Sequence, residues 1–216
     1  MLDRRLRAAA DRAFTVLARP VADRGVRAEW ITLLGFVFGV GACVAIAADQ
    51  RVVALVLWLA NRLADGLDGA IARRVGVTDR GGFVDIVADF AVYGGFVVGV
   101  AYARPDARFA VVLLLFAYYV SGSALLAWSS LAERRARIAG DNRSLHFVGG
   151  IAEGAETIVV YVLLCLWPSA TETIVWVFAA AVGITAAQRV AFAWRSLSDH
   201  GSSFDPERVA GSGPGG

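Results

Sequence analysis

Six apolar segments, each about as long as a bilayer is thick, constrain this chain more than any other feature. A helix needs about 20 residues to cross ~30 Å of hydrocarbon, and it satisfies its own backbone hydrogen bonds there. A hydrophobic content of 57% and a mean hydropathy of +0.60 agree with this interpretation. We therefore predict an all-α integral membrane bundle of six transmembrane helices, approximately at residues 29–48, 52–73, 82–103, 109–131, 149–167 and 171–195.

The arginines indicate how the bundle is oriented. The chain has no lysine, and most of its arginines lie before Ala28, in the linker from Arg74 to Gly81 and in the linker from Ala132 to Val148. Since cytoplasmic loops are enriched in basic residues, we expect both termini and these linkers to face the cytoplasm of a multi-pass cell-membrane protein. A net charge of only +2 argues against nucleic acid as a partner.

The chain divides into three predicted parts. Residues 1–28 place apolar side chains such as Leu6 and Phe14 on one side and arginines on the other. This pattern is typical of an amphipathic helix in the headgroup plane, with an ordinary solvated helix as the alternative. Residues 29–196 form the six-helix domain, and residues 197–216, which end in a Gly- and Ser-rich run, are expected to be a disordered tail.

Four aspartates interrupt the second and third apolar segments: Asp65, Asp68, Asp85 and Asp89. A charged side chain at membrane depth costs roughly 2.5–3.5 kcal/mol on insertion scales, so such residues are functional candidates. Spacings of three and four residues place each pair on one helix face. The short linker between the segments should bring the two faces together near the cytoplasmic side.

Such a cluster needs compensating positive charge. Carboxylate oxygens suit a hard ion such as Mg²⁺, Mn²⁺ or Ca²⁺, and the lack of a nearby His or Cys argues against zinc. Two ions would clamp phosphate oxygens, as in phosphoryl transfer. The alternative is a salt-bridged cluster in which Arg62 and Arg73 neutralise the acids. Gly69 and Ala72, beside the acids, leave room either for a ligand or for close packing of helices.

These residues closely resemble the signature of the CDP-alcohol phosphotransferase (CDP-alcohol phosphatidyltransferase) family. Its pattern is D-x-x-D-G-x-x-A-R, a spacer, then G-x-x-x-D-x-x-x-D. Residues 65–73 read Asp-Gly-Leu-Asp-Gly-Ala-Ile-Ala-Arg and residues 81–89 read Gly-Gly-Phe-Val-Asp-Ile-Val-Ala-Asp, so every fixed position matches. One departure is the spacer from Arg74 to Arg80, which has seven residues where eight are expected.

The resemblance implies a site and a reaction. In this family a CDP-activated donor gives its phosphoester group to an alcohol and CMP leaves. Carried over, the four aspartates bind two divalent ions, Mg²⁺ or Mn²⁺, at the pyrophosphate, and Asp89 also takes the proton from the attacking hydroxyl. The resemblance also suggests a homodimer, and it assigns contacts with the CDP moiety to Thr32, Gly69, Ala72, Arg73 and Gly81.

The acceptor is less constrained by the sequence. Glu153 and Glu156 open the fifth segment at its cytoplasmic end and are expected to border the same cavity. Two glutamates favour a polyol or an amine-bearing alcohol as acceptor, although acids at a helix N-terminus also need no ligand. The arginines and the G-K stretch that the family uses for phosphorylated acceptors are missing here.

We therefore predict an enzyme that transfers a phosphatidyl group from CDP-diacylglycerol to a small alcohol. A CDP-choline or CDP-ethanolamine type aminoalcohol phosphotransferase is one alternative. An intramembrane prenyltransferase is disfavoured because its N-D-x-x-D motif has an asparagine before the first aspartate, whereas Ala64 precedes Asp65 here. A non-enzymatic cation or proton transporter would be expected to carry acids in both halves of the membrane, whereas these acids lie only toward one side.

Overall fold

The computed structural model describes residues 14–139 and 154–198, and its long elements are all helices. They are α2 (Ala28–Ala47), α3 (Arg51–Val75), α4 (Asp79–Ala103), α5 (Arg108–Ala139), α6 (Gly154–Leu166) and α7 (Thr171–Ser198). Two short 3₁₀ turns, η1 (Pro105–Ala107) and η2 (Pro168–Ala170), begin at prolines and connect α4 to α5 and α6 to α7. The all-α prediction is confirmed for these residues.

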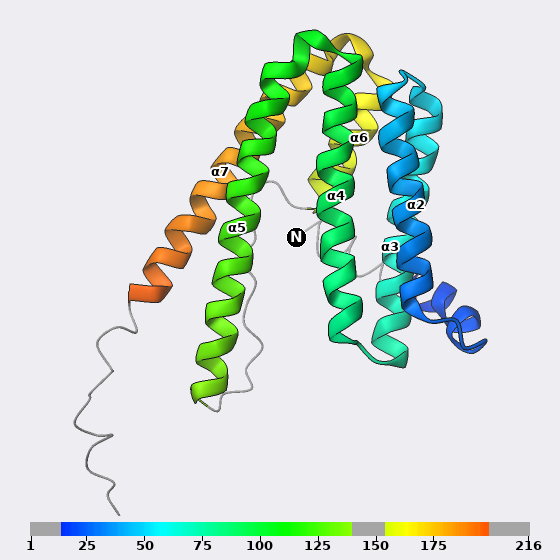
Figure 1. Ribbon diagram of the computed structural model, residues 1–216, viewed down its shortest axis with the longest axis vertical. Helices are drawn as coiled ribbons and strands as arrows, with labels where there is room; N and C mark the ends of the chain where they lie inside the picture. The colour runs from blue at the N-terminus through cyan, green and yellow to red at the C-terminus, as the bar shows by residue number, and fades with distance from the viewer. Residues whose placement is uncertain (1–13, 140–153, 199–216) are drawn as a thin grey trace, which may run out of the picture.

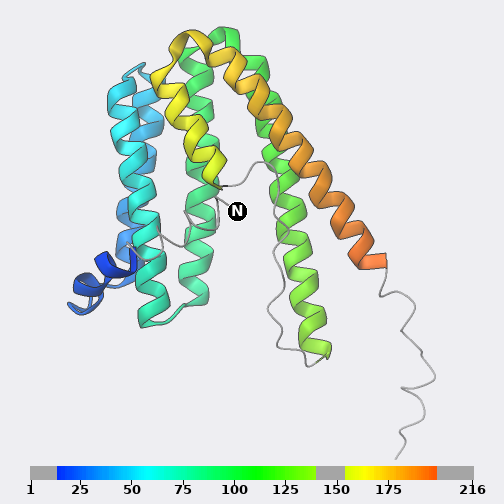
Figure 2. The same cartoon turned by 180° about the vertical axis from the view of Figure 1, so that it is seen from behind.

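The helices run up and down along one common direction (Figure 1). α2, α3, α4 and α6 stand side by side, whereas α5 and α7 lean away from them toward the end of the bundle at which α3 passes into α4 (Figures 1 and 2). Within the described residues, α2, α4, α5 and α7 are each long and apolar enough to cross a membrane. The chain is therefore a multi-pass membrane protein.

Helix α3 has 25 residues, about 37 Å, so its length also suffices to cross the hydrocarbon core. Its composition is less apolar than that of the other long helices, because its second half carries the charged residues of the signature. The described part of α6 has 13 residues, and residues 140–153 before it lie outside the described part of the chain.

Helix α2 is the common wall on which α3 and α4 pack, while α3 and α4 make little backbone contact with each other. Two glycines on one face of α2 permit this. A Cβ at Gly35 would lie 3.0 Å from the Cβ of Ala64 on α3, and a Cβ at Gly39 would lie 2.4 Å from Cγ2 of Val92 on α4. The two helices thus approach α2 closely and leave the space between them to side chains.

Aromatic rings fill the middle of the bundle. Trp58 of α3, Phe96 of α4 and Tyr161 of α6 are fully buried, and the rings of Phe96 and Tyr161 stack with centroids 4.4 Å apart. The Tyr161 hydroxyl donates to the backbone oxygen of Tyr93 at 2.8 Å and lies 3.2 Å from the Tyr118 hydroxyl. Buried hydroxyl groups are therefore satisfied within the core, as low-dielectric surroundings require.

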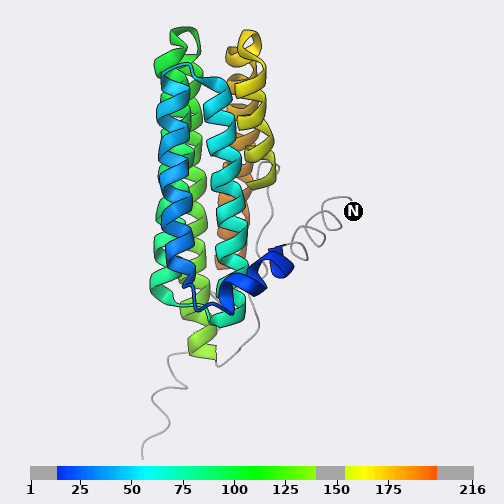
Figure 3. The same ribbon diagram turned by 90° about the vertical axis from the view of Figure 1, so that its right-hand side faces the viewer.

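The N-terminal segment forms a helix over residues 14–22, which lies against the lower end of α3 at a steep angle to the bundle (Figure 3). Ala18 of this helix is buried with Ala70 and Ile71 of α3. Asp23 and Arg74 form an ion pair at 3.0 Å. The described part of this segment thus packs on the end of α3 that carries the acidic motif. Residues 1–13 lie outside the described range.

The helix ends lie close to the predicted ones, with one clear exception. The linker predicted to begin at Ala132 is instead helical to Ala139. Alanine, glutamate and arginine are strong helix formers, so the helix continues after the apolar pattern has ended. The tail predicted from residue 197 falls mostly on residues 199–216, which the structure does not describe.

Candidate metal and nucleotide site

The acidic residues of α3 and α4 come together at one end of the bundle. One carboxylate oxygen from each of Asp65, Asp68 and Asp85 can be chosen so that all three lie within 4.8 Å of one another. Asp65 lies ten residues before the end of α3 and Asp85 six residues after the start of α4, about 15 Å and 9 Å along the two helices. The acids therefore share one depth, inside the apolar part of the bundle.

The turn between the two helices sets this alignment. Gly76 ends α3 with a φ of +125°, a conformation that favours glycine. Thr78 caps α4, where its side-chain oxygen accepts a hydrogen bond from the N–H of Gly81 at 3.0 Å. A turn of only three residues thus joins the helices, and the spacer that is one residue shorter than expected still places the two acidic faces opposite each other.

Asp89 is held apart from the other three acids. Its Oδ1 accepts a hydrogen bond from Arg62 Nη2 at 2.8 Å. Arg62 Nη1 lies 3.8 Å from Asp65 Oδ2, and its side chain is only 8% exposed. The salt-bridged alternative therefore describes Asp89, and more weakly Asp65, whereas Asp68 and Asp85 form no ion pair with Arg62.

One carboxylate oxygen of Asp68 lacks a hydrogen-bond donor. Asp68 is only 6% exposed, and its Oδ2 is buried without a hydrogen-bond partner among the described residues. A buried carboxylate oxygen with no donor is costly. Three converging carboxylates, one of them with an unsatisfied oxygen, fit a hard divalent cation with oxygen ligands. The residues present thus fit the Mg²⁺ or Mn²⁺ that the sequence suggested.

A cavity of about 460 Å³ opens beside these carboxylates, between the start of α2, the end of α3 and the start of α4. Its walls include Asp68, Asp85 and all five residues assigned to the CDP moiety from the sequence: Thr32, Gly69, Ala72, Arg73 and Gly81. A smaller cavity of about 10 Å³ shares Asp68 and Asp85 with it and extends to Asp65 and Asp89. The sequence-predicted acids and nucleotide contacts therefore border two adjoining cavities with lining residues in common.

The small residues leave room at this wall. A Cβ at Gly69 would lie 3.4 Å from an Nη1 of Arg73, so the Arg73 guanidinium folds back over Gly69 at the cavity edge. The Thr32 hydroxyl donates to the backbone oxygen of Ala28 at 3.2 Å. Gly81 contributes backbone and uses its N–H in the cap of α4.

The sequence prediction missed a charged pair at the other end of this cavity. Arg27 Nε and Nη2 each donate to one carboxylate oxygen of Glu29 at 3.2 Å, and both residues line the cavity wall. Glu29 stands three residues before Thr32, so both lie on one side of α2. An arginine and an acid two residues apart at the start of an apolar segment are the sequence signal that could have identified the pair.

Of the two predicted acceptor residues, only Glu156 belongs to the part of the chain that the structure describes. Glu156 lies exposed in the first turn of α6 and does not line the cavities that contain the aspartates. Glu153 lies outside the described residues. A polar contact that the sequence analysis did not single out lies on the neighbouring helices, where Arg189 of α7 donates to the Ser121 hydroxyl of α5 at 2.8 Å. An arginine within a membrane helix is a functional candidate in its own right.

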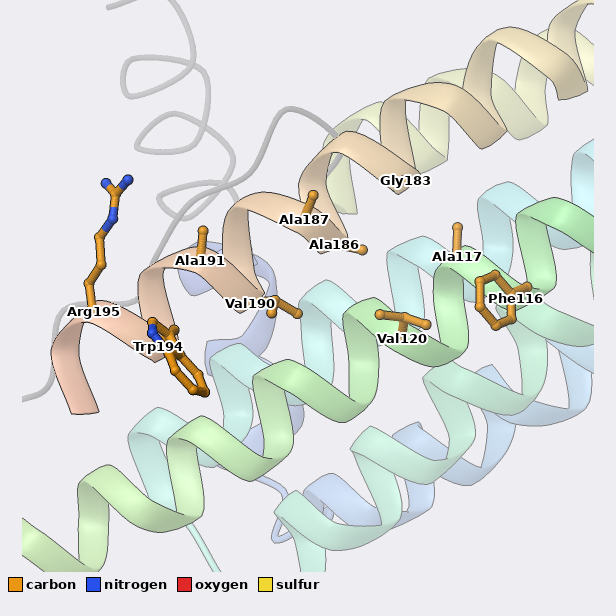
Figure 4. A pocket seen from close by; sticks show the side chains of 10 residues that line it. All are labelled: Phe116, Ala117, Val120, Gly183, Ala186, Ala187, Val190, Ala191, Trp194 and Arg195. Atoms are coloured by element: carbon orange, nitrogen blue, oxygen red, sulfur yellow. The ribbon is translucent and has the colours of Figure 1, made fainter. Parts of the chain in front are cut away.

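A second cavity, about 680 Å³, lies between α5 and α7 (Figure 4). Its lining is almost entirely apolar, with Phe116, Val120 and Val190 along the groove and Trp194 and Arg195 toward one end (Figure 4). Such a groove offers no group for acid, base or metal chemistry. It provides apolar surface of the kind that lipid or another membrane helix covers.

Comparisons with known proteins find one family over most of the chain. A sequence model described as CDP-alcohol phosphatidyltransferase matches residues 26–188. The chain is 39% identical over 196 residues to the inner membrane protein YnjF of Escherichia coli, covering 88% of this chain and 94% of that protein. It is 28% identical over 185 residues to an archaetidylinositol phosphate synthase of Methanothermobacter thermautotrophicus, covering 82% of this chain and 89% of that protein.

Solved structures of phosphatidylinositol phosphate synthase (PgsA1) from Mycobacterium tuberculosis share the fold. The structure with CDP-DAG bound superposes with a TM-score of 0.69 at 22% identity, covering 85% of this chain and 94% of that one. The structure in complex with manganese and citrate gives a TM-score of 0.67 at 25% identity, covering 84% and 88%.

Proposed function

Because the chain belongs to the CDP-alcohol phosphatidyltransferase family, we propose that it moves a phosphatidyl group from CDP-diacylglycerol to a small alcohol and releases CMP. One observation carries the proposal. The two halves of the signature converge so that three carboxylates lie together, and two of them, Asp68 and Asp85, border a cavity of about 460 Å³ whose other walls hold the small residues of the motif. The similar structure with CDP-DAG bound supports this donor.

The donor is expected to lie with its diphosphate at the aspartates and its cytidine in the larger cavity. Gly69 and Ala72 leave space for the nucleoside there, and Arg73 at the edge supplies positive charge for phosphate oxygens. The Arg27–Glu29 pair offers both donors and an acceptor to a base edge, and a carboxylate is a good acceptor for the exocyclic amino group of cytosine.

In the proposed step, the acceptor hydroxyl oxygen attacks the phosphorus that carries the diacylglycerol. The bond from that phosphorus to the bridging oxygen of the diphosphate breaks, and CMP leaves with the oxygen. The hydroxyl proton passes to Asp89, which acts as general base. Arg62 holds the Asp89 carboxylate through a 2.8 Å hydrogen bond, so the base has a defined position.

Asp65, Asp68 and Asp85 would hold the divalent ions, and we propose two of them, with Asp89 as a further ligand on the side facing Asp65. Bound Mg²⁺ or Mn²⁺ would neutralise the diphosphate and the charge that develops on departing CMP. The related structure in complex with manganese and citrate supports a metal-dependent site.

The acceptor is proposed to be a small polyol or an amine-bearing alcohol that enters from the side of the site facing α5 and α6. Glu153 and Glu156 remain proposed contacts at the start of α6. A phosphorylated polyol is a second candidate, since a similar protein is an archaetidylinositol phosphate synthase and since Arg189 supplies a half-buried positive charge on α7.

We further propose that all six helices cross the cell membrane, with residues 1–28 as an amphipathic juxtamembrane segment and residues 29–196 as the catalytic domain. The site and both termini would face the cytoplasm, because the described arginines Arg74, Arg80 and Arg134 lie at the same end of the bundle as the aspartates (Figure 1). A homodimer is the expected assembly, for which the apolar groove between α5 and α7 offers one of several lipid-facing surfaces.

The proposal is tested with detergent-purified protein, CDP-diacylglycerol and Mn²⁺. The assay records CMP release with serine, glycerol, inositol, choline, glycerol phosphate and inositol phosphate, one at a time. CMP release that depends on one acceptor would support the proposal and identify that acceptor. With CDP-choline and CDP-ethanolamine as donors and diacylglycerol as acceptor, the same assay tests the aminoalcohol alternative. No CMP from any pair would refute the enzymatic proposal.

A further inference from the structure

We propose that Arg62 is a positioning residue that holds the Asp89 carboxylate in a fixed orientation beside the cluster of Asp65, Asp68 and Asp85. The inference rests on the proposed function and adds a residue that lies outside the signature. The guanidinium of Arg62 lies between the carboxylates of the site and the aromatic core. Hydrogen-bond acceptors and aromatic rings around the guanidinium fix its position.

Three hydrogen bonds hold the guanidinium in one place. Nη2 donates to Asp89 Oδ1 at 2.8 Å, Nη1 donates to the Tyr93 hydroxyl at 2.6 Å, and Nε donates to Asn61 Oδ1 at 2.8 Å. Asn61 is itself fixed, because its amide nitrogen donates to the backbone oxygen of Gly35 at 2.8 Å. Arg62 therefore links α3 to α4 directly and to α2 through Asn61.

Two aromatic rings close the other side. The Arg62 guanidinium carbon lies 4.9 Å from the ring centroid of Trp58 and 4.9 Å from that of Tyr93. These contacts are within the range of cation–π attraction, which is stronger in a desolvated position. A planar guanidinium can satisfy rings and several acceptors together, whereas a lysine ammonium cannot reproduce the same fork of donors.

The placement has two separable consequences for the site. The first is orientation: Asp89 is pulled toward Arg62, and it is absent from the group of three carboxylates within 4.8 Å. The second is charge: a permanently positive group only 3.8 Å from Asp65 reduces the negative potential that an incoming cation meets. Orientation should govern the rate of turnover, and charge should govern the affinity for metal.

The experiment compares wild-type full-length protein with the variants Arg62→Gln and Arg62→Lys. Arg51→Gln is the matched control, since Arg51 also forms a short ion pair, with Asp49 at 2.7 Å, but at the opposite end of the bundle. Measurements are Mn²⁺ affinity by electron paramagnetic resonance without substrate, kcat and KM for CDP-diacylglycerol from CMP release, and the melting temperature in detergent.

For Arg62→Gln we expect kcat to fall about 100-fold with KM for CDP-diacylglycerol changed less than about threefold, as for a loss of orientation in the reacting complex. Mn²⁺ should bind at least about threefold more tightly, because the nearby positive charge is gone. Arg62→Lys should restore wild-type Mn²⁺ affinity but leave kcat at least about fivefold low, because charge returns without the fork geometry. Arg51→Gln should change neither Mn²⁺ affinity nor kcat.

Several results would overturn the inference. A purely structural role predicts that Mn²⁺ affinity, kcat and KM all worsen together with the melting temperature. Wild-type kcat in either Arg62 variant would also refute the positioning role. If Arg62→Gln does not fold, the kcat of Arg62→Lys decides, together with Tyr93→Phe, which removes one acceptor of Arg62 and should lower kcat severalfold. The Mn²⁺ titration needs no substrate, so it tests Arg62 even if the wild-type protein releases no CMP.

Discussion

Gly39 of α2 offers a sharp test of how the site depends on helix packing, because replacing it with alanine should separate α4 from α2. The added Cβ would lie 2.4 Å from Cγ2 and 2.9 Å from Cγ1 of Val92, whereas ordinary contact begins at 3.4 Å. A valine in a helix strongly prefers one rotamer, so Val92 cannot simply turn away. Helix α4 must therefore move by about 1 Å, in a core packed at crystal-like density.

That shift gives the expected magnitudes. Overpacking of this kind costs about 1–3 kcal/mol of stability. Asp85 and Asp89 lie on the same helix as Val92, while Asp65 and Asp68 lie on α3, so the shift changes the distances between the two pairs. A displacement of about 1 Å at reacting groups can cost on the order of 100-fold in rate. We expect Gly39→Ala to lower kcat by about that factor, although it touches no reacting group.

The assay is CMP release together with thermal unfolding in detergent. Gly94→Ala is the matched control, because a Cβ there would meet only the Cδ2 of Leu115, at 3.9 Å. The double variant Gly39→Ala with Val92→Ala removes both clashing methyl groups and should recover most of the lost activity, giving a strong coupling between the two sites. If Gly39→Ala were as active and as stable as Gly94→Ala, the argument that α2 sets the carboxylate spacing would be wrong.

Three further predictions concern the site itself. Asp68→Asn should reduce CMP release at least 100-fold and weaken Mn²⁺ binding, while Asp79→Asn, in the exposed first turn of α4, should do neither; unchanged Mn²⁺ binding in Asp68→Asn would argue against a metal ligand. EDTA should abolish activity, and added Mg²⁺ or Mn²⁺ should restore it; activity that persists in excess EDTA would exclude a required divalent ion. Glu29→Gln should lower the preference for a CDP donor over the matching UDP donor about tenfold, with KM rather than kcat affected, and an unchanged ratio would remove Glu29 from base recognition.

Much of the fold and of the site could be predicted because both depend on local patterns. Apolar runs of bilayer length located the helices, and spacings of three and four residues predicted which carboxylates share a face. The structure brings Asp65, Asp68 and Asp85 together, and the family assignment that the signature suggested is confirmed. The spacing and residue types of a motif thus predict which side chains share a helix face and which ligands suit them.

The remaining features depend on neighbours that no spacing reveals. The role proposed for Arg62 follows from its contacts with Trp58 and Tyr93, and these contacts exist only once α3 and α4 have packed on α2. The sequence predicted that the acidic faces of α3 and α4 meet, and their side chains do. It did not reveal that the two backbones pack on α2, at Gly35 and Gly39, rather than on each other. The longer α5 reflects helix propensity beyond the apolar segment, which a search for hydrophobic runs does not detect.

The buried aromatic rings next to Arg62 bear on how the membrane voltage acts on the site. Trp58, Phe96 and Tyr161 are fully buried between the acidic end of the bundle and the opposite one, so the acids open to one side of the membrane only. The voltage across a bilayer is worth about 2.3 kcal/mol per elementary charge per 100 mV, and it falls mainly across the insulating part of a structure. A doubly charged diphosphate that approaches this end therefore crosses little of the field. We therefore expect the proposed transfer to proceed at the same rate whether or not a voltage is applied across the membrane.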